Sequence, residues 1–274
     1  MLMEGKNHKK SYRALKNQIK VSFLSVKYAL MRELLNKATF IMNVTFMIIN
    51  NSTFIIQWVI LYSLKENVGG YTFKQVLLLW GIAASTFGFS HFFFKRAYSL
   101  SDIITNGKLD SYLVQPKNVL LAAITSDVES SAIGDMIYGY IIMCVSEFTI
   151  GKFVLFTLFT ICGGLIITSI AVILASLSFW FSRSDMIADS GNSIVNHIST
   201  YPDGIFKGIT RIILFTIIPV GIINYIPVWV MTEFSLALTI IVILITVVSI
   251  LFAFAVFYKG LRKYSSSNLM VSRI

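Results

Sequence analysis

Long stretches without a charged residue limit how this chain can fold. One of them covers residues 38–64, and as a helix it is about 40 Å long, more than the roughly 30 Å of a bilayer's hydrocarbon core. Such a stretch folds as a helix, which satisfies its backbone groups internally where water is absent. The composition agrees, because 56% of the 274 residues are hydrophobic and only 13% are charged, against about 25% charged in soluble domains. The sequence therefore predicts an all-α integral membrane protein without a soluble domain.

Six transmembrane spans are predicted from the apolar runs. They cover residues 38–64, 75–94, 133–148, 153–181, 208–224 and 236–258, which together make a transmembrane domain of residues 38–258 and leave a cytoplasmic tail of residues 259–274. The fifth run is interrupted at Pro219, and Pro227 follows soon after it. Proline breaks a helix because it lacks a backbone N–H. We therefore expect a short fifth span and a broken, re-entrant or interfacial segment before span six.

The second predicted span carries small residues at the spacing that lets two helices approach closely. Gly81 and Ser85 are four residues apart, and so are Ala84 and Gly88. Small residues at this spacing let helix backbones come close together inside a membrane. The second span is therefore expected to pack tightly against a neighbouring helix.

Residues 1–37 contain a basic, amphipathic helical pattern. Its apolar residues are three or four positions apart, at Tyr12, Leu15, Ile19, Phe23, Val26, Leu30 and Leu34, and Lys and Arg occupy the other faces. Such a helix lies on a membrane surface, because its charges meet anionic lipid headgroups while its apolar edge enters the acyl boundary. Packing against a soluble partner is the alternative. We expect an interfacial helix in contact with membrane lipids.

The basic residues gather on one side of the predicted spans. The net charge is +10, from 23 Lys and Arg against 13 Asp and Glu. With six spans both termini lie on the same side, and twenty of the 23 Lys and Arg fall there, in residues 1–37, 95–118, 183–211 and 259–274. An excess of Lys and Arg marks the cytoplasmic side of a membrane protein. The sequence therefore predicts cytoplasmic termini and, because the charge borders the spans, no nucleic-acid partner.

A polar stretch, residues 95–118, joins the second and third predicted spans. Ser99 or Ser101 can cap a short helix there, and Asp102 suits the positive first turn of that helix. A second short segment then runs into Pro116, which can open the next helix. A short, capped helix between two spans can dock onto another protein, and an ordinary surface loop is the alternative.

Several amides and one acid stand out inside the predicted spans. They are Asn43, Asn50, Asn51 and Gln57 in the first span and Asp135 near the start of the third. Amides in hydrocarbon are tolerated where they face other helices, and a carboxylate at that depth is costly unless it has a partner or a role. We interpret these residues as an inter-helix polar surface or a translocation path. Solvation at the membrane interface is the alternative for Asp135.

The sequence lacks the motifs of the common enzyme classes. It has no G-x-x-x-x-G-K-[ST] phosphate loop, no HExxH motif and no GxSxG elbow. His91, Asp135 and His197 fall on separate segments, which argues against an intramembrane enzyme. Cys144 and Cys162 have no CxxC partner, so we interpret them as small core residues. We therefore expect no catalytic site, no bound metal and no cofactor on this chain.

Two motifs make the chain resemble a known family. A G-x-L-D-x-x-L-x-x-P pattern matches Gly107, Leu109, Asp110, Leu113 and Pro116, and a Y-P…P…N-Y-x-P pattern matches Tyr201, Pro202, Pro219, Asn224, Tyr225 and Pro227. With these motifs essentially the whole chain resembles the six-span permease subunits of type-2 ATP-binding-cassette transporters, in the uncharacterised transport system permease group.

The resemblance implies the membrane subunit of an exporter in the plasma membrane, expected to be bacterial. It implies an N-terminal connecting helix, a coupling helix between spans two and three, and a separate ATPase subunit that binds ATP and Mg²⁺. A second permease chain, the same or different, is also implied. We take Asp102, Lys108 and Asp110 as candidates for the surface that docks on the ATPase, with Leu109 and Leu113 as apolar anchors.

An ATP-independent secondary carrier or channel is the competing function. It predicts intramembrane charge pairs or an inverted repeat, and the two halves of the sequence show no convincing self-similarity. The substrate stays open, because an apolar lining with amides suits lipids, amphipathic drugs, peptides and glycan precursors alike.

Overall fold

The computed structural model describes residues 2–181, 184–216 and 219–265, and the part of the predicted C-terminal tail beyond residue 265 lies outside them. The described residues form helices and no β-strand. In chain order the helices are α1 Leu2–Glu33, α2 Lys37–Leu64, α3 Phe73–Tyr98, α4 Leu100–Thr105, α5 Asp110–Leu113, α6 Val119–Ile124, α7 Ser131–Glu147, α8 Ile150–Ser176, η1 Leu177–Phe179, α9 Ser184–Ile198, η2 Asp203–Ile205, α10 Ile209–Thr216, η3 Gly221–Tyr225, α11 Ile226–Thr232 and α12 Leu236–Leu261.

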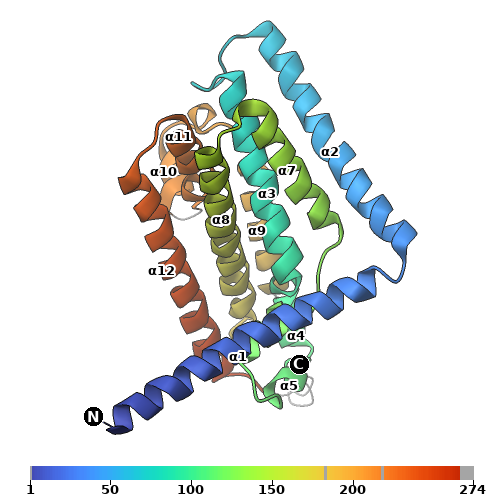
Figure 1. Ribbon diagram of the computed structural model, residues 1–274, viewed down its shortest axis with the longest axis vertical. Helices are drawn as coiled ribbons and strands as arrows, with labels where there is room; N and C mark the ends of the chain where they lie inside the picture. The colour runs from blue at the N-terminus through green and yellow to red at the C-terminus, as the bar shows by residue number, and fades with distance from the viewer. Residues whose placement is uncertain (1, 182–183, 217–218, 266–274) are drawn as a thin grey trace.

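Six helices, α2, α3, α7, α8, α9 and α12, run lengthwise beside one another (Figure 1). Helix α1 lies across one end of this bundle, where the short helices α4 and α5 also lie, and we call it the α1 end. Helices α10 and α11 and the loop of residues 65–72 lie at the other end, which we call the opposite end. Helix α1 and the bent α10–α11 segment therefore lie at opposite ends of the bundle.

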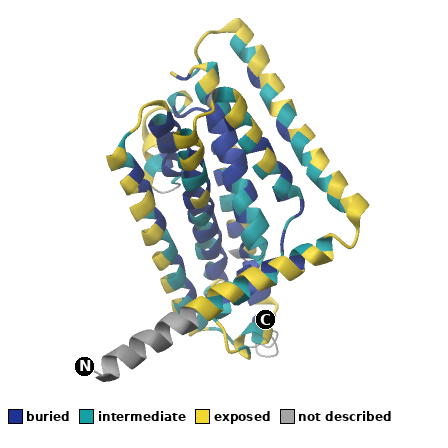
Figure 2. Cartoon of the chain, in the orientation of Figure 1, coloured by how far each residue is buried: buried dark blue, intermediate teal, exposed yellow. Residues whose placement is uncertain are grey.

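Helices α3 and α8 form the centre of the bundle. In each of them 67% of the most apolar stretch is buried, compared with 11% in α2 and 22% in α12. Figure 2 shows the same contrast, with buried residues concentrated on α3 and α8 and exposed ones along α2 and α12. The exposed side chains of α2 and α12 are largely apolar, as expected for surfaces that face lipid or another membrane protein.

Four helical segments are long and apolar enough to cross a bilayer. They are Lys37–Leu64, Phe73–Thr105, Ile150–Phe179 and Leu236–Leu261, and they coincide with predicted spans one, two, four and six. The second continues from α3 into α4 through a kink at Phe94, whose backbone is not helical. At the third predicted span, Ser131–Ser146 of α7 forms a shorter apolar helix.

The fifth predicted span, residues 208–224, is not one straight helix. Helix α10 and the following segment Gly221–Thr232 are bent by 74° relative to each other. Pro219 lies at this break, and its carbonyl oxygen accepts hydrogen bonds from the two backbone N–H groups that open η3. Pro227 lies in the first turn of α11, directly after the π-helical turn η3, and the backbone on both sides of it is helical. The chain therefore changes from π-helix to α-helix at Pro227 and does not break there.

Residues 183–211 were predicted to lie wholly on the same side as both termini, and this prediction is wrong. Within them the 15-residue helix α9 packs lengthwise against α8 and α3. Its Gly191 lies so close to α8 that a Cβ there would meet Leu174 Cδ1 at 2.7 Å. After α9, Gly204 lies against the backbone of Gly69 at the opposite end. The chain has crossed from one end to the other.

Helix α9 was missed because polar and apolar residues alternate along it without a long apolar run. It buries a narrow apolar edge that includes Ala188 and Val195, and the rest of its sequence mixes polar residues with exposed Met186, Ile187 and Ile194. From its composition alone this segment is therefore predicted to be a loop. Its position moves Lys207 and Arg211 to the opposite end, and most of the Lys and Arg remain at the α1 end.

Glycines let α3 and α7 pack backbone against backbone. A Cβ on Gly88 would meet Met136 Cγ at 2.6 Å, and one on Gly139 would overlap the Ser85 hydroxyl and the Gly81 carbonyl oxygen. This geometry confirms the close approach predicted from the small residues of the second span.

Gly139→Ala is expected to lower the free energy of unfolding by about 1–3 kcal/mol, because the added methyl group has no room beside α3. Gly151→Ala is the matched control, since nothing lies within 4 Å of its Cβ position and alanine favours a helix. Thermal unfolding in mild detergent measures both variants. Equal melting temperatures would contradict the tight α3–α7 contact.

Candidate functional site

Helices α2, α3, α7 and α9 line a cavity of about 280 Å³. We call it the polar cavity, because its walls carry Asn50 and Asn51 from α2, Asp135 from α7, and Asn196 and His197 from α9. These residues are far apart in the sequence, and the packing of four helices brings them to one space. The structure thus joins Asn50, Asn51 and Asp135 of the predicted polar surface. It also brings His91, Asp135 and His197, which the sequence places on separate segments, to the wall of one cavity.

Asp135 is held by a hydrogen bond across two helices. The side-chain amide of Asn51 donates to Asp135 Oδ1 at 2.6 Å and to the Met47 carbonyl oxygen at 3.0 Å. Asn51 is buried and Asp135 is half-buried. Among the described residues no cationic side chain forms an ion pair with Asp135. The cavity therefore contains a carboxylate whose partner is a neutral amide.

His91 is fixed in the wall of the polar cavity by α3 itself. Its Nδ1 lies 3.1 Å from the Phe87 carbonyl oxygen, which can only accept, so Nδ1 carries a proton. The imidazole stacks on Tyr98 with ring centroids 4.0 Å apart. The Tyr98 hydroxyl is 2.7 Å from Ser90 Oγ, which is 2.6 Å from Thr168 Oγ1 on α8. These contacts orient His91 and tie α3 to α8.

Aromatic rings form the rest of the wall. Phe54 and Trp80 pack with ring centroids 4.8 Å apart, and Phe87 and Tyr201 line the same space. Trp80 Nε1 and Asn196 Oδ1 are buried without a hydrogen-bond partner among the described residues. Buried polar atoms without a partner are uncommon in folded proteins and indicate a place for water or a ligand.

Two predicted polar residues lie elsewhere. The amide of Asn43 donates to Ser130 Oγ at 3.0 Å and so fastens α2 to the start of α7. Gln57 is exposed on α2, outside the lining of the polar cavity. Asn196 was missed because residues 183–211 were interpreted as a loop. The spacing of Ala188, Gly191 and Val195 along one helical face could have revealed α9.

The polar cavity offers hydrogen bonds, one carboxylate and aromatic faces. No three His, Cys, Asp or Glu side chains gather to hold a metal ion in the part of the chain that the structure describes. The arrangement is therefore suited to binding a molecule of mixed polar and apolar character.

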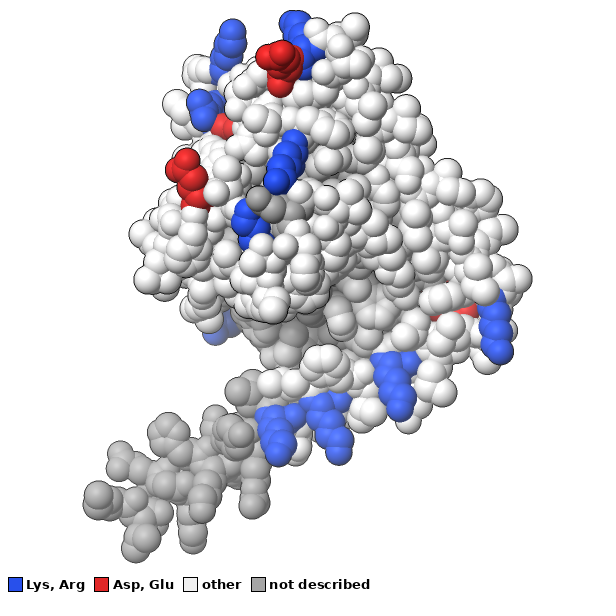
Figure 3. Space-filling model, turned by 45° about the horizontal axis from the view of Figure 1, so that its top comes forward, with Lys and Arg blue, Asp and Glu red and all other residues white. Residues whose placement is uncertain are grey.

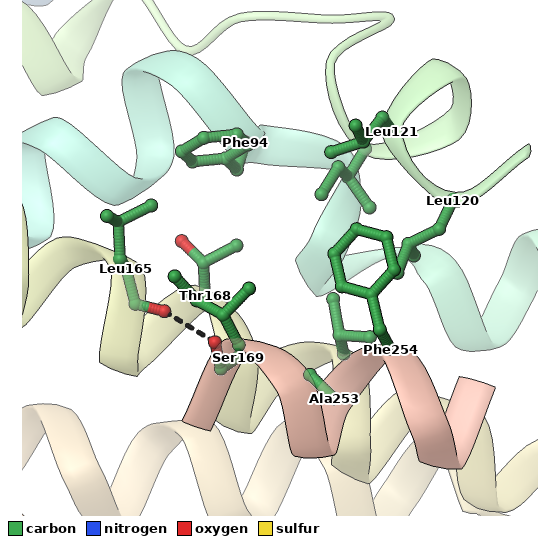
Figure 4. A pocket seen from close by; sticks show the side chains of 11 residues that line it. Phe94, Leu120, Leu121, Leu165, Thr168, Ser169, Ala253 and Phe254 are labelled. Atoms are coloured by element: carbon green, nitrogen blue, oxygen red, sulfur yellow. Dashed lines mark hydrogen bonds between the residues drawn. The ribbon is translucent and has the colours of Figure 1, made fainter. Parts of the chain in front are cut away.

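A second, smaller pocket of about 90 Å³ lies between α3, α6, α8 and α12 (Figure 4). Phe94, at the kink of α3, and Phe254 of α12 contribute to its apolar lining. Its hydroxyl groups are engaged within α8, where Ser169 donates to the Leu165 carbonyl oxygen at 2.7 Å and Thr168 to the preceding turn. We call it the apolar pocket, and it contrasts with the polar cavity in offering no carboxylate or amide.

The loop of residues 99–118 lies at the α1 end and is tied to its own chain. Lys108 Nζ pairs with Asp102 Oδ2 at 2.8 Å, and Asp110 Oδ1 accepts a hydrogen bond from the Tyr264 hydroxyl at 2.9 Å. Burial and the Asp110 carboxylate raise the pKa of Tyr264. The polar residues predicted to dock a partner thus already form contacts inside the chain.

The apolar residues of this loop differ in exposure. Leu109 is fully buried, so it packs inside the chain instead of serving as the external anchor that the sequence suggested. Leu113 is 41% exposed and Val114, which the sequence analysis did not single out, is 84% exposed. The loop therefore exposes Leu113 and Val114 at the α1 end.

Ion pairs fasten α1 to the bundle. Asp127 lies between Arg32 of α1 at 2.6 Å and Arg96 of α3 at 3.4 Å, and Lys95 pairs with Glu129 at 3.0 Å. The Asp127 side chain is only 15% exposed, so solvent screens these pairs less than surface pairs. The end of α3 is thereby linked to α1.

The apolar stripe of α1 is divided between two surfaces. Val26 and Ala29 are buried against the bundle, whereas Ile19, Phe23 and Tyr28 are exposed. Figure 3 shows Lys and Arg side chains along α1 beside a surface with little charge. This distribution suits a helix that packs on the bundle and meets a membrane surface.

At the opposite end, buried polar contacts hold a cap together. Arg211 pairs with Asp203 at 2.6 Å, and the Asp203 side chain is 3% exposed. Trp229 Nε1 donates to the Tyr71 hydroxyl at 3.0 Å, and burial raises the pKa of Tyr71. These contacts join the 65–72 loop, the segment after α9 and the bent α10–α11 segment.

Asn51→Leu is expected to lower the free energy of unfolding by about 1–3 kcal/mol, because Asp135 loses its hydrogen-bond donor inside the bundle. Asn50→Leu changes an exposed neighbour in the same way and should alter stability by less than about 0.5 kcal/mol. Thermal unfolding of the purified chain compares them. If both variants matched the unmodified chain, the Asn51–Asp135 contact would have no role in stability.

A family model described as "ABC-2 family transporter protein" matches residues 26–268 of the chain. The match includes every helix that lines the polar cavity and the loop at the α1 end. Neither the curated proteins nor the solved structures contain a significant match.

Proposed function

The chain belongs to the ABC-2 transporter family, and on that basis we propose that it is the permease subunit of an ATP-driven exporter. Members of this family are generally non-enzymatic membrane components that are paired with an ATPase subunit. The apolar helices fit a multi-pass membrane location. In the proposed function the polar cavity lies on the translocation path, and ATP and Mg²⁺ bind to the separate ATPase subunit.

The polar cavity is the observation that carries this proposal. It collects a carboxylate, amides and an imidazole inside a bundle whose outer helices α2 and α12 are apolar. Polar side chains inside a membrane are expensive and are kept where they line a path or bind a substrate. A permease needs such a space between its helices.

The proposed topology has six crossings, by α2, α3, α7, α8, α9 and α12. The α10–α11 hairpin enters from the outer side without crossing. Most of the Lys and Arg residues lie at the α1 end, so that end and both termini face the cytoplasm. The short helices of the 99–118 loop then lie where a cytoplasmic ATPase can reach them.

The 99–118 loop is suited to transmit a conformational change of the ATPase to the helices of the bundle. Val114 is exposed at its surface, and behind it Leu109 is buried in the same core as Phe257 of α12. Asp110 is hydrogen-bonded to the segment that follows α12. A displacement of the loop would therefore move the ends of α3 and α12 together, as in a rigid-body transition between two states.

A second permease chain is expected beside α9. Asp189, Ser193 and His197 are exposed on this helix although α9 lies lengthwise against α8 and α3. Hydrocarbon cannot satisfy such groups, so a protein or a water-filled surface must cover them. A second chain, the same or a different one, would cover α9 and close the open side of the polar cavity.

Val114→Asp is expected to weaken association with the ATPase on the order of tenfold, because an apolar contact is replaced by a charge. Phe234→Asp is the matched control, since Phe234 is 67% exposed at the opposite end. Co-purification of the tagged chain with its ATPase in mild detergent, followed by ATP hydrolysis, measures the effect. Asp110→Arg is less direct because it also removes the contact with Tyr264.

The same preparation tests the proposed function as a whole. ATP-dependent export by vesicles that contain both subunits supports it. A chain that purifies without an ATPase and transports without ATP would contradict it and would favour a secondary carrier.

Ser193→benzoylphenylalanine is expected to give a light-induced covalent product of two permease chains, because the position lies on the proposed contact surface. Val248→benzoylphenylalanine on α12, where Val248 is 62% exposed, should react with lipid only. Gel electrophoresis and mass spectrometry identify the products. Lipid products alone at position 193 would place the second permease elsewhere.

A further inference from the structure

We propose that the polar cavity selects amphipathic organic cations, which makes this chemical class the transported substrate. Asp135 would hold the positive group, and Trp80 and Phe54 would hold an aromatic or apolar body. The inference rests on the proposed function, because a binding site becomes a transport site only if the cavity lies on the translocation path.

Asp135 brings a carboxylate into the polar cavity without a countercharge. Its Oδ1 accepts from the neutral amide of Asn51 at 2.6 Å, and its Oδ2 accepts no hydrogen bond from the described residues. A carboxylate surrounded by protein attracts a cation more strongly than one in bulk water, because less solvent screens the charge. A cationic ligand would supply the partner that the chain does not.

The other polar groups of the cavity include acceptors that suit a cation, beside the unpaired N–H donor of Trp80. The described residues that line it include no Lys or Arg. Asn196 Oδ1 is a buried acceptor without a partner. His91 uses Nδ1 as a donor to its own helix, which leaves Nε2 of the neutral ring as an acceptor. Acceptors suit the N–H groups of an ammonium or guanidinium, whereas a phosphate would meet the carboxylate of Asp135.

The aromatic wall supplies the second half of the recognition. Trp80 packs on Phe54, and Phe87 lines the same space. Indole and phenyl faces attract cations and bury apolar surface. The small side chains of Ala83 and Ala84 lie on the same stretch of α3 and leave room beside these rings. The apolar pocket has aromatic residues without a carboxylate, so the pairing of charge and aromatic surface is a feature of the polar cavity.

The test uses two probes of nearly the same shape and opposite charge, tetraphenylphosphonium and tetraphenylborate. Each is titrated calorimetrically into the purified full chain in phosphatidylcholine nanodiscs, with empty nanodiscs subtracted. Asp135→Asn should raise the Kd of tetraphenylphosphonium on the order of tenfold and lower that of tetraphenylborate. Glu66→Gln, which removes an exposed acid at the opposite end, should leave both values within about twofold.

A further pair of variants separates recognition from folding. Trp80→Leu should weaken tetraphenylphosphonium binding severalfold, and Trp80→Phe should retain most of it because a ring remains. Retained binding of tetraphenylborate shows that a variant is folded. The proposal is overturned if Asp135→Asn affects the two probes alike, or if the unmodified chain prefers the anion.

The outcome is separable from that of the proposed function, because binding to the isolated chain needs neither ATP nor the ATPase. Cation binding that depends on Asp135, in a chain that lacks an ATPase partner, would support the cavity's selectivity while contradicting the exporter. ATP-dependent export without cation selectivity would support the exporter and contradict this inference.

Discussion

Polar side chains inside this bundle are stable where the protein supplies their hydrogen-bond partners, because hydrocarbon supplies none. Many hydroxyl groups meet this need within their own helix. Ser169, Ser176 and Thr246 each donate to the carbonyl oxygen four residues earlier. Asp135 is an acceptor and has no such local solution, so it depends on Asn51 of another helix. The polar cavity forms where a polar side chain cannot find its hydrogen-bond partner within its own helix.

Glycine packing makes that cross-helix contact possible. A Cβ on Gly134 would meet the Val44 carbonyl oxygen of α2 at 2.6 Å, so α7 approaches α2 closely at the residue before Asp135. On its other side α7 packs against α3 through Gly88 and Gly139. Helix α7 is therefore wedged between two helices at distances that larger residues would prevent. The position of the carboxylate follows from backbone packing, and its hydrogen bond follows from its position.

Helix α3 joins the cavity to the α1 end. Its middle carries Trp80 and His91 in the cavity wall, and its last turns carry Lys95 and Arg96, which pair with the segment before α7. The kink at Phe94 lies between these two regions. A central helix that contacts the cavity, α1 and the 99–118 loop is a physical route by which events at the α1 end can alter the cavity.

The sequence by itself determined the helical membrane class, four of the long apolar helices and the close packing of the second span. These features follow from composition and local spacing, because a helix surrounded by lipid must be apolar along its length. The tertiary structure decided what depends on neighbours: that α9 crosses the bundle, that Leu109 is buried and Val114 exposed, and that Asn196 and Trp80 meet Asp135. A helix that packs on the protein through one apolar edge carries no long apolar run, so its place in the bundle is set by contacts that lie far apart in the sequence.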